Sequence, residues 1–516
     1  MSDSNYLKIE AKLNDIGDLK HISNILHWDE AVVMPQKSAT SRNQALGALS
    51  KLIHQKNHDP ELKQLIQKIN QEELNCWQKA NFQWIKKKQI EAYLIPENLV
   101  LEKTIKFKES EQAWRQYRHQ NNWKGFLPYL ERTVAIAKKI AQIKADYYQV
   151  SPYDALLDDF SPGVRSSEID DIFSQLKVFL PKTIKVIVTK QKQDTFLPFE
   201  REFDLNKQKF LAHDLMKIVG FDFEYGRLDT SDHPFCGGNK DDVRITTRYS
   251  KTDLLSSAMA VCHETGHAMY ELQLPKQYKY QPVGQALGMS VHESQSLLVE
   301  MHACRNKGFI AIMSSLLHKH FANDQNMDIF SSKNLYTYLT QVKPGLIRVG
   351  ADEVTYPLHV ILRYEIEKAL INDEITVKDL PKLWDEKMLY YLGVDTHGNY
   401  QDGVMQDVHW PAGLFGYFPA YALGAVLAAQ FYEAALKSDN TIDSAMNQGS
   451  FSPLMNWLKA HVHSQGSLHS FHDLVKQATG KDFSVDSYIN HIKKRYLGSN
   501  ALFDNTSDNS VVASTL

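Results

Sequence analysis

Cysteine is scarce in this sequence of 516 residues, which contains only four. They lie far apart and none belongs to a Cys-x-x-Cys pair, so we expect neither a disulfide framework nor a cysteine-rich metal site. This usage is typical of a reducing compartment. The four are Cys76, Cys236, Cys262 and Cys304.

Long apolar runs are also absent. The longest, YALGAVLAA at residues 421–429, is far shorter than the ~20 residues that would cross a bilayer. The N-terminal segment alternates charged and apolar side chains and lacks the uninterrupted apolar stretch of a signal peptide. We therefore expect a cytoplasmic protein with no membrane partner.

An excess of charge of one sign is missing as well. The 58 Lys and Arg residues nearly balance the 61 Asp and Glu residues, which leaves a formal charge of −3. Such a chain has no net field to hold a polyanion, so nucleic acid is not expected as a partner. The hydrophobic content of 43% is enough to build a large buried core, which indicates a globular protein.

Helical periodicity dominates the chain. Segments such as residues 81–94 and 126–145 carry apolar side chains three and four positions apart. Between residues 219 and 249, Gly, Asp and Pro surround two short β-prone runs, which favours a small sheet or hairpin. We expect a mainly α-helical protein whose number of domains these patterns leave open, with a loosely ordered tail over residues 499–516.

The sequence His263-Glu264-Thr265-Gly266-His267 fits the HExxH pattern within a stretch of helical spacing. Residues i and i+4 lie on one face of a helix, so both imidazoles can reach one metal ion, and Glu264 can contact a water molecule on it. The alternative is two partly buried histidines with local hydrogen bonds, but the neighbouring Glu would then be buried at a cost.

A catalytic zinc needs a third protein ligand and one open position. No histidine follows His267 closely, which excludes the metzincin arrangement and favours a Glu from a second helix. Glu293 is the best candidate, with His292 and His302 as competitors. A carboxylate placed at a helix start by the helix dipole is the alternative role for Glu293.

Such a site predicts amide hydrolysis. The metal lowers the pKa of a bound water, Glu264 accepts its proton as general base, and the hydroxide attacks a carbonyl. Donors for the resulting oxyanion are expected from His409, Tyr417 and Tyr421, although each can equally be a core residue with a satisfied polar tip.

An exopeptidase must also bind a terminal carboxylate, which the planar guanidinium of arginine does well. Arg244 and Arg348 are the candidates. For Arg348 the alternative is a helical ion pair with Asp352, four residues further on.

Six motifs follow one another along the chain. They are HPF at 233–235, DxRxT at 242–246, HExxH at 263–267, HESQ at 292–295, IRxxAD at 347–352 and GxxQDxHW at 403–410. In this order they resemble the motifs of the carboxypeptidase Taq family, the thermostable carboxypeptidase 1 type of metallocarboxypeptidases. The resemblance covers nearly the whole chain, including HWD at 27–29 and YDALLD at 153–158.

The resemblance implies a single catalytic domain over residues 1–498, with a mainly helical fold and a deep central groove, similar to angiotensin-converting enzyme and neurolysin. It implies a homodimer that binds one Zn²⁺ per chain, with Co²⁺ as a possible substitute. Peptides with a free C-terminus would lose single amino acids with broad specificity, and C-terminal proline would be a poor substrate.

The resemblance also assigns roles to individual residues. His263, His267 and Glu293 become the metal ligands and Glu264 the general base. The remaining residues would contact the substrate: Arg348 as the carboxylate anchor, His409 and Tyr421 near the carbonyl and oxyanion, and Tyr417, Arg244 and His233 in the groove.

Two other functions are compatible with these motifs. An oligoendopeptidase or a dipeptidyl carboxypeptidase would use the same HExxH site, and the position of the carboxylate anchor distinguishes them. A helical scaffold protein with a structural metal would need a closed set of four ligands, for which His292 is available.

Overall fold

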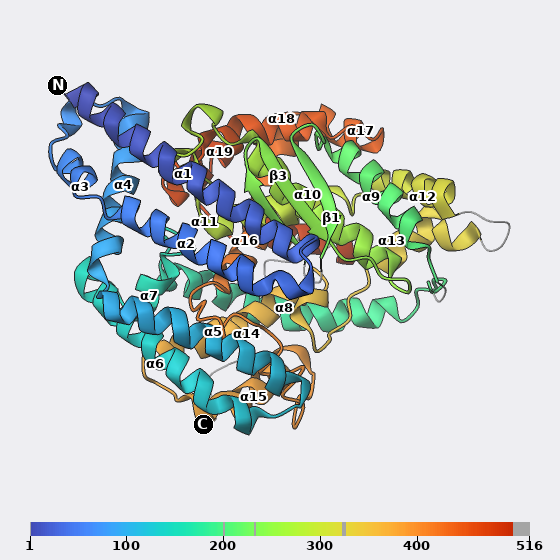
Figure 1. Cartoon of the computed structure of the whole chain (residues 1–516). Coiled ribbons are helices and arrows are strands. Elements are labelled where there is room, and N and C mark those ends of the chain that lie inside the picture. Colours follow the sequence, from blue (N-terminus) through green and yellow to red (C-terminus); the bar gives the residue numbers. More distant parts are fainter. Residues whose placement is uncertain (1, 200–201, 232–233, 322–326, 499–516) are drawn as a thin grey trace, which may run out of the picture.

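The computed structural model describes residues 2–199, 202–231, 234–321 and 327–498 (Figure 1). The mainly helical fold predicted from the sequence is confirmed. The tail expected over residues 499–516 and His233 lie outside the described residues. None of the described helices is both long and apolar enough to cross a membrane.

The N-terminal helices form a unit with a hydrophobic core of its own. Apolar side chains of α1, α3 and α4 make this core, which includes Tyr6, Leu62 and Phe82. Helix α2 packs beside α1 and has no buried residue, and the two run across the front of the molecule (Figure 1). The bounds are α1 Ser2–Val32, α2 Ala39–Asn57, α3 Pro60–Gln67 and α4 Cys76–Leu94.

The next helices build one side of the main body. Helix α6 buries an apolar stripe, as the spacing over residues 126–145 predicts, and it ends at Gln149, which adopts a left-handed conformation with φ of 55°. The bounds are α5 Glu97–His119, α6 Trp123–Tyr148, α7 Pro152–Leu157, α8 Ser166–Gln191 and α9 Leu205–Val219.

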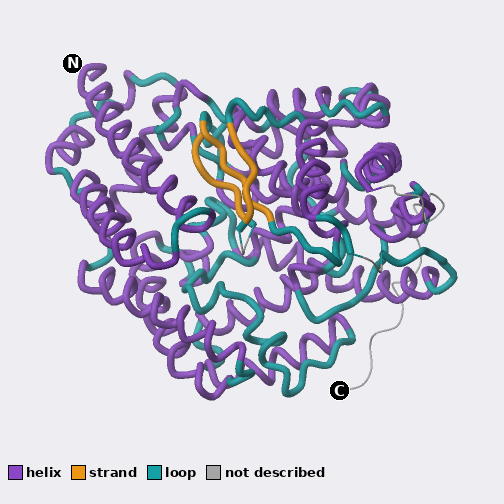
Figure 2. The backbone as a smooth tube through the Cα atoms, turned by 45° about the vertical axis from the view of Figure 1, so that its right-hand side comes forward, coloured by secondary structure: helices purple, strands orange, loops and turns teal. Residues whose placement is uncertain are grey.

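The predicted small sheet has three strands, β1 Gly226–Thr230, β2 Phe235–Asn239 and β3 Asp242–Thr247. Their order is β1-β3-β2, with β1 parallel and β2 antiparallel to β3. Helices surround the sheet (Figure 2), and the buried side chains of Val243 and Ile245 on β3 face inward while Arg244 between them does not.

Helices α10 Leu254–Gln273, α11 Gly288–Leu297 and α16 Pro419–Ser438 pack together at the centre of the main core. Two glycines allow this close approach. A Cβ at Gly266 of α10 would lie 2.6 Å from the Gln295 carbonyl oxygen, and one at Gly424 of α16 would lie 2.8 Å from the Glu293 Cβ. Helix α11 is thereby held between two neighbours.

The remaining elements complete the body around this centre. A π-helix, η5 Leu298–Ala303, continues α11, and a second, η10 Lys493–Leu497, continues α20. The other bounds are α12 Lys307–Phe321, α13 Ser332–Leu339, α14 Tyr356–Ile371, α15 Leu380–Leu392, α17 Thr441–Asn447, α18 Ser452–His461, α19 Phe471–Thr479 and α20 Asp486–Ile492.

Candidate active site

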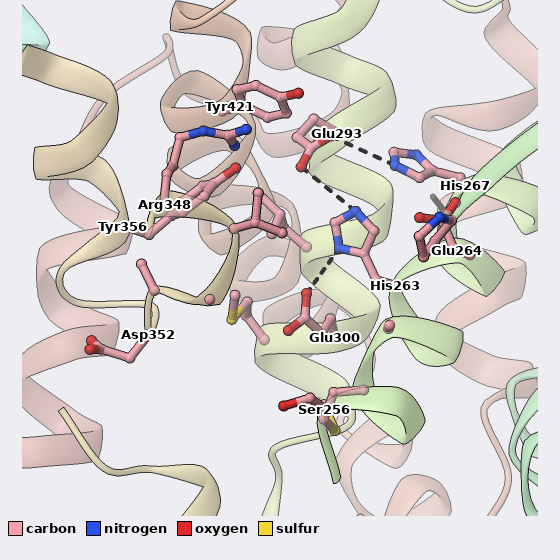
Figure 3. Close-up of a pocket in the computed structure, with 18 of the residues that line it drawn as sticks. Ser256, His263, Glu264, His267, Glu293, Glu300, Arg348, Asp352, Tyr356 and Tyr421 are labelled. Carbon is pink, nitrogen blue, oxygen red and sulfur yellow. Dashed lines mark hydrogen bonds and ion pairs between the residues drawn. The ribbon is translucent and has the colours of Figure 1, made fainter. Parts of the chain in front are cut away.

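The HExxH motif lies on α10, which faces a pocket of about 670 Å³. Asp253 caps the start of this helix by accepting from the Ser256 N–H. His263 and His267 are one turn apart and both line the pocket (Figure 3). The sequence prediction of a helix with both histidines on one face therefore agrees with the structure.

Glu293 on α11 completes a group of three potential metal ligands. Its two carboxylate oxygens lie 3.8 Å from His263 Nε2 and 3.7 Å from His267 Nε2. The ligand atoms of the three residues are all within 4.8 Å of one another. Glu293 is the sixth residue of α11, so the alternative of a helix-start carboxylate is wrong.

The competing ligands point elsewhere. His292 Nε2 lies 2.9 Å from Glu271 Oε1, and its Nδ1 contacts the Nδ1 of His267 rather than the Nε2 atoms. His302 is buried beside His491. Within the part of the chain that the structure describes, no fourth His, Cys, Asp or Glu joins the group.

These donors suit a zinc-type ion. Two imidazole nitrogens and one carboxylate oxygen are the donors of many catalytic zinc sites, which keep a further position open. Burial raises the pKa of Glu293, so its charged form needs a positive partner. The site therefore fits a metal ion that retains an open position toward the pocket.

Glu264 lines the same pocket next to His263. Burial raises the pKa of Glu264 to about 7. General acid–base catalysis is most efficient when the pKa of the catalytic group lies near the working pH. The Glu264 side chain and the three candidate ligands lie on the side of the pocket that faces Arg348 in Figure 3.

Arg348 lies across the pocket from the histidines (Figure 3). Its Nε and Nη2 atoms both donate to Asp407 Oδ1, at 3.1 and 2.8 Å. The guanidinium group stacks on the Tyr421 ring at 4.5 Å. Among the described residues no partner is found for Nη1, so this edge of the group is available to a ligand in the pocket.

The predicted alternative, a helical pair between Arg348 and Asp352, is wrong. Residues Arg348–Gly350 form a 3-10 turn rather than an α-helix. Asp352 instead accepts from the backbone N–H groups of Lys343, Val354 and Thr355.

Asp407 is shared by two arginines. Arg363 Nε donates to Asp407 Oδ2 at 2.7 Å, while Arg348 binds the other oxygen. Burial alone would raise the pKa of Asp407, but Arg348 and Arg363 hold this pKa well below its usual range. The carboxylate is therefore a permanent support for the Arg348 side chain.

His409, Tyr417 and Tyr421 lie together beside Arg348. His409 Nε2 is 3.1 Å from the Tyr421 hydroxyl oxygen, and the rings of Tyr417 and Tyr421 are 5.2 Å apart. Both tyrosines line the pocket, whereas His409 lies behind them. Burial, with Arg348 adding to it, lowers the pKa of His409 to about 3, so its imidazole is neutral.

Arg244 does not join the pocket lining. Because side chains alternate along a strand, Arg244 points away from the core toward α1. Its guanidinium group stacks 4.3 Å from the ring of Trp28 and donates to Asp242. Pro234 and Phe235, which follow His233, do line the pocket.

The sequence analysis assigned no role to three residues at or behind the pocket. Tyr356 and Glu300 line the pocket, and Asp407 supports Arg348. Asp407 is part of the GxxQDxHW motif, so the motif marked this residue but did not indicate that it binds Arg348. Glu300 follows Glu293 by seven residues, about two helical turns, which is the only local signal that both face one side.

A candidate metal-ligand group on two packed helices, with a carboxylate beside it in the same pocket, is the arrangement expected of a metallopeptidase of the HExxH-plus-Glu class. The model of the carboxypeptidase Taq (M32) metallopeptidase family matches residues 8–496, and the chain belongs to this family. The chain is thus a peptidase, as the sequence motifs predict.

Relatives cover nearly the whole chain. It is 35% identical over 491 residues to thermostable carboxypeptidase 1 of Thermus thermophilus, which covers 93% of this chain and 95% of that one. It is 35% identical over 488 residues to carboxypeptidase 1 of Bacillus subtilis, with 93% and 96% covered. The solved structure of Trypanosoma cruzi metallocarboxypeptidase 1 matches with a TM-score of 0.92 at 35% identity, over 96% and 99% of the two chains.

Proposed function

We propose that this chain is a zinc-dependent carboxypeptidase that hydrolyses the last peptide bond of its substrates and releases single amino acids. The observation that carries the proposal is the presence of Arg348 in the same pocket as the group of His263, His267 and Glu293. One wall of the pocket offers donors to a metal, and the facing wall offers a positive charge to a terminal carboxylate.

His263, His267 and Glu293 would hold the ion, and Glu264 would move the proton. A bound zinc supplies Lewis acidity to the scissile carbonyl and lowers the pKa of water. The Glu264 carboxylate accepts a proton from the attacking water and returns it to the departing amine nitrogen.

Tyr421 and His409 would act on the carbonyl oxygen. A neutral His409 can donate its Nε2–H to the Tyr421 oxygen, which leaves the tyrosine hydroxyl proton for the substrate. That proton stabilises negative charge as it develops on the carbonyl oxygen. Tyr417 packs against Tyr421 and limits where its ring can lie.

Arg348 would bind the terminal carboxylate through the Nη1 edge. Asp407 occupies Nε and Nη2, so the guanidinium cannot turn without losing two hydrogen bonds. A fixed anchor requires the scissile bond to lie at a set distance from the C-terminus, and this distance determines how many residues are released.

The remaining features follow from the family and stay proposals. These are zinc as the native metal with cobalt as a substitute, broad preference with slow release of proline, a homodimer and a cytoplasmic location. Several apolar side chains of the pocket, including Leu255, Met259 and Leu339, suit varied C-terminal residues without selecting one charge.

The products of an N-blocked tetrapeptide distinguish this function from its alternatives. We expect the last amino acid to appear first and the penultimate one to follow, as measured by mass spectrometry over time. Early release of a C-terminal dipeptide would indicate a dipeptidyl carboxypeptidase, and cleavage at an internal bond would indicate an oligoendopeptidase.

A further inference from the structure

The imidazole of His263 lies between two carboxylates of one continuous helical segment (Figure 3). Its Nε2 faces Glu293 at 3.8 Å, and its Nδ1 lies 2.9 Å from Glu300 Oε2. Glu300 belongs to η5, the π-helix that continues α11. The metal-ligand candidate therefore has a dedicated partner on the side opposite the other ligands.

The contact defines the tautomer of His263. The second oxygen of Glu300 accepts from Arg305 Nη2 at 3.0 Å, so this carboxylate is placed as an acceptor toward both neighbours. His263 Nδ1 must then carry a hydrogen, and Nε2 faces Glu293 and the pocket. A histidine held in this way is oriented for metal binding before the ion arrives.

The two histidines differ in this respect. His267 Nδ1 lies 3.1 Å from the backbone carbonyl oxygen of His292, a partner that no side-chain substitution removes. His267 Nδ1 also lies 2.7 Å from the Nδ1 of the His292 side chain, and Glu300 contacts His263 alone of the two histidines. A substitution of Glu300 thus changes one ligand and leaves the other in place.

The π-helix that carries Glu300 is fixed from the C-terminal end of the chain. Met301, the next residue, presents its carbonyl oxygen to Arg495 Nη1 at 2.7 Å. Arg495 belongs to η10 and also donates to Glu353 Oε1 at 2.6 Å. Arg495 and Glu353 are both buried at their charged groups, with 10% and 4% of their side chains exposed.

We propose that Glu300 is a positioning residue that orients His263 for metal binding, and that Arg495 clamps the π-helix in the conformation that places Glu300. This inference rests on the proposed function, because it concerns the same metal group. Two carboxylates of one helical segment then serve the ion differently, Glu293 as a ligand and Glu300 through His263.

Metal affinity of the substrate-free protein tests the role of Glu300. The dissociation constant for Co²⁺ and Zn²⁺ is measured by competition with a chromophoric chelator for wild type, Glu300→Ala and Glu300→Gln. We expect Glu300→Ala to bind about 10- to 100-fold more weakly. Glu300→Gln, which keeps an acceptor oxygen, should recover part of this loss, and the visible absorption of bound Co²⁺ should change in Glu300→Ala.

Glu367→Gln is the matched control, since Glu367 is a fully buried carboxyl that bonds to Tyr153 and not to a metal-ligand candidate. It should bind metal as the wild type does. Wild-type affinity and an unchanged Co²⁺ spectrum in Glu300→Ala would overturn the inference while leaving the proposed function intact. A wild-type chain that binds neither metal would overturn both.

Arg495→Met tests the clamp, with the neighbouring exposed Lys494→Met as its control. We expect weaker Co²⁺ binding only in Arg495→Met, and circular dichroism of the metal-free proteins confirms that each is folded. Should Arg495→Met not fold, Arg495→Lys, which keeps a charge but can make fewer hydrogen bonds, takes its place. Equal affinity of the clamp variant and the Lys494→Met control would overturn the role of Arg495.

Discussion

Arg348 presents only part of its guanidinium group to the pocket, because Nε and Nη2 both donate to Asp407. Arg363 holds the other oxygen of the same carboxylate. The position of one arginine thus depends on a buried acid and on a second arginine. A ligand carboxylate in the pocket meets a positive charge that is fixed in direction.

Substitution of Asp407 by Asn is expected to weaken substrate binding. The change removes a charged acceptor from Arg348 and leaves its side chain free to turn, so KM should rise and kcat/KM should fall by about 10- to 100-fold, the value of one or two charge-assisted hydrogen bonds. Steady-state kinetics on an N-blocked dipeptide measures this. An unchanged KM in Asp407→Asn would show that Arg348 does not bind the substrate through this geometry.

Substitution of Glu264 by Gln is expected to stop the chemistry without removing the metal group. Gln cannot accept the proton of the attacking water, so kcat should fall by about 10²- to 10⁴-fold. Metal content of the purified variant should match the wild type, because His263, His267 and Glu293 are unchanged. Near-normal kcat would exclude Glu264 as the base.

At the scale of elements, the sheet joins the N-terminal unit to the pocket. The ring of Trp28 on α1 stacks with the guanidinium groups of Arg227 on β1 and Arg244 on β3, whose Cζ atoms lie 4.7 and 4.3 Å from the ring centroid. The neighbouring strand β2 brings Phe235 and Cys236 into the pocket lining. The contact of α1 therefore supports the strands that shape one pocket wall.

Trp28→Ala should loosen α1 and α2 without abolishing catalysis. Cation–π stacking and burial of the ring are lost, and we expect a decrease in the free energy of unfolding of about 1–3 kcal/mol together with faster proteolysis within α2. Limited proteolysis and urea denaturation measure these effects.

Arg244→Ala should lower stability in the same way, because it removes the same stacking contact with Trp28. A large rise in KM for Arg244→Ala alone would instead support the substrate-contact role suggested by the family.

Sequence patterns predicted those elements whose formation depends on neighbouring residues in the chain. The helix of His263 and His267, the second helix with Glu293 and the small sheet all follow from spacing and turn residues. The pairing of Arg348 with Asp407 spans 59 residues and depends on tertiary packing, so the sequence suggested Asp352 instead. The inward or outward face of Arg244 depended on strand register, and the π-helix of Glu300 has no clear sequence signature.

At the scale of the whole molecule, a buried carboxyl group makes the stability of the fold depend on pH. Glu367 on α14 is fully buried and accepts from the hydroxyl of Tyr153 on α7. Burial raises the pKa of Glu367 from 4.5 to about 8. The folded chain therefore holds a proton between these values that the unfolded chain releases.

The contribution of Glu367 to stability should consequently fall as pH rises from 4.5 to about 8. The contribution of Glu367 is fully present below pH 4.5, decreases by about 1.4 kcal/mol per pH unit and is lost above the folded-state pKa. Glu367→Gln carries no titrating proton, so its free energy of unfolding should decline less between pH 5 and pH 9 in urea titrations. Parallel declines of wild type and variant would show that Glu367 does not carry this dependence.

The most direct test of carboxypeptidase action compares an N-blocked dipeptide with its C-terminally amidated twin, using purified protein before and after chelation and after addition of zinc or cobalt. We predict release of the free amino acid only from the unamidated substrate, loss of the rate on chelation and its recovery with metal. Equal cleavage of both substrates, or a rate that survives complete metal removal, would contradict the assignment of Arg348 and the metal group to one catalytic pocket.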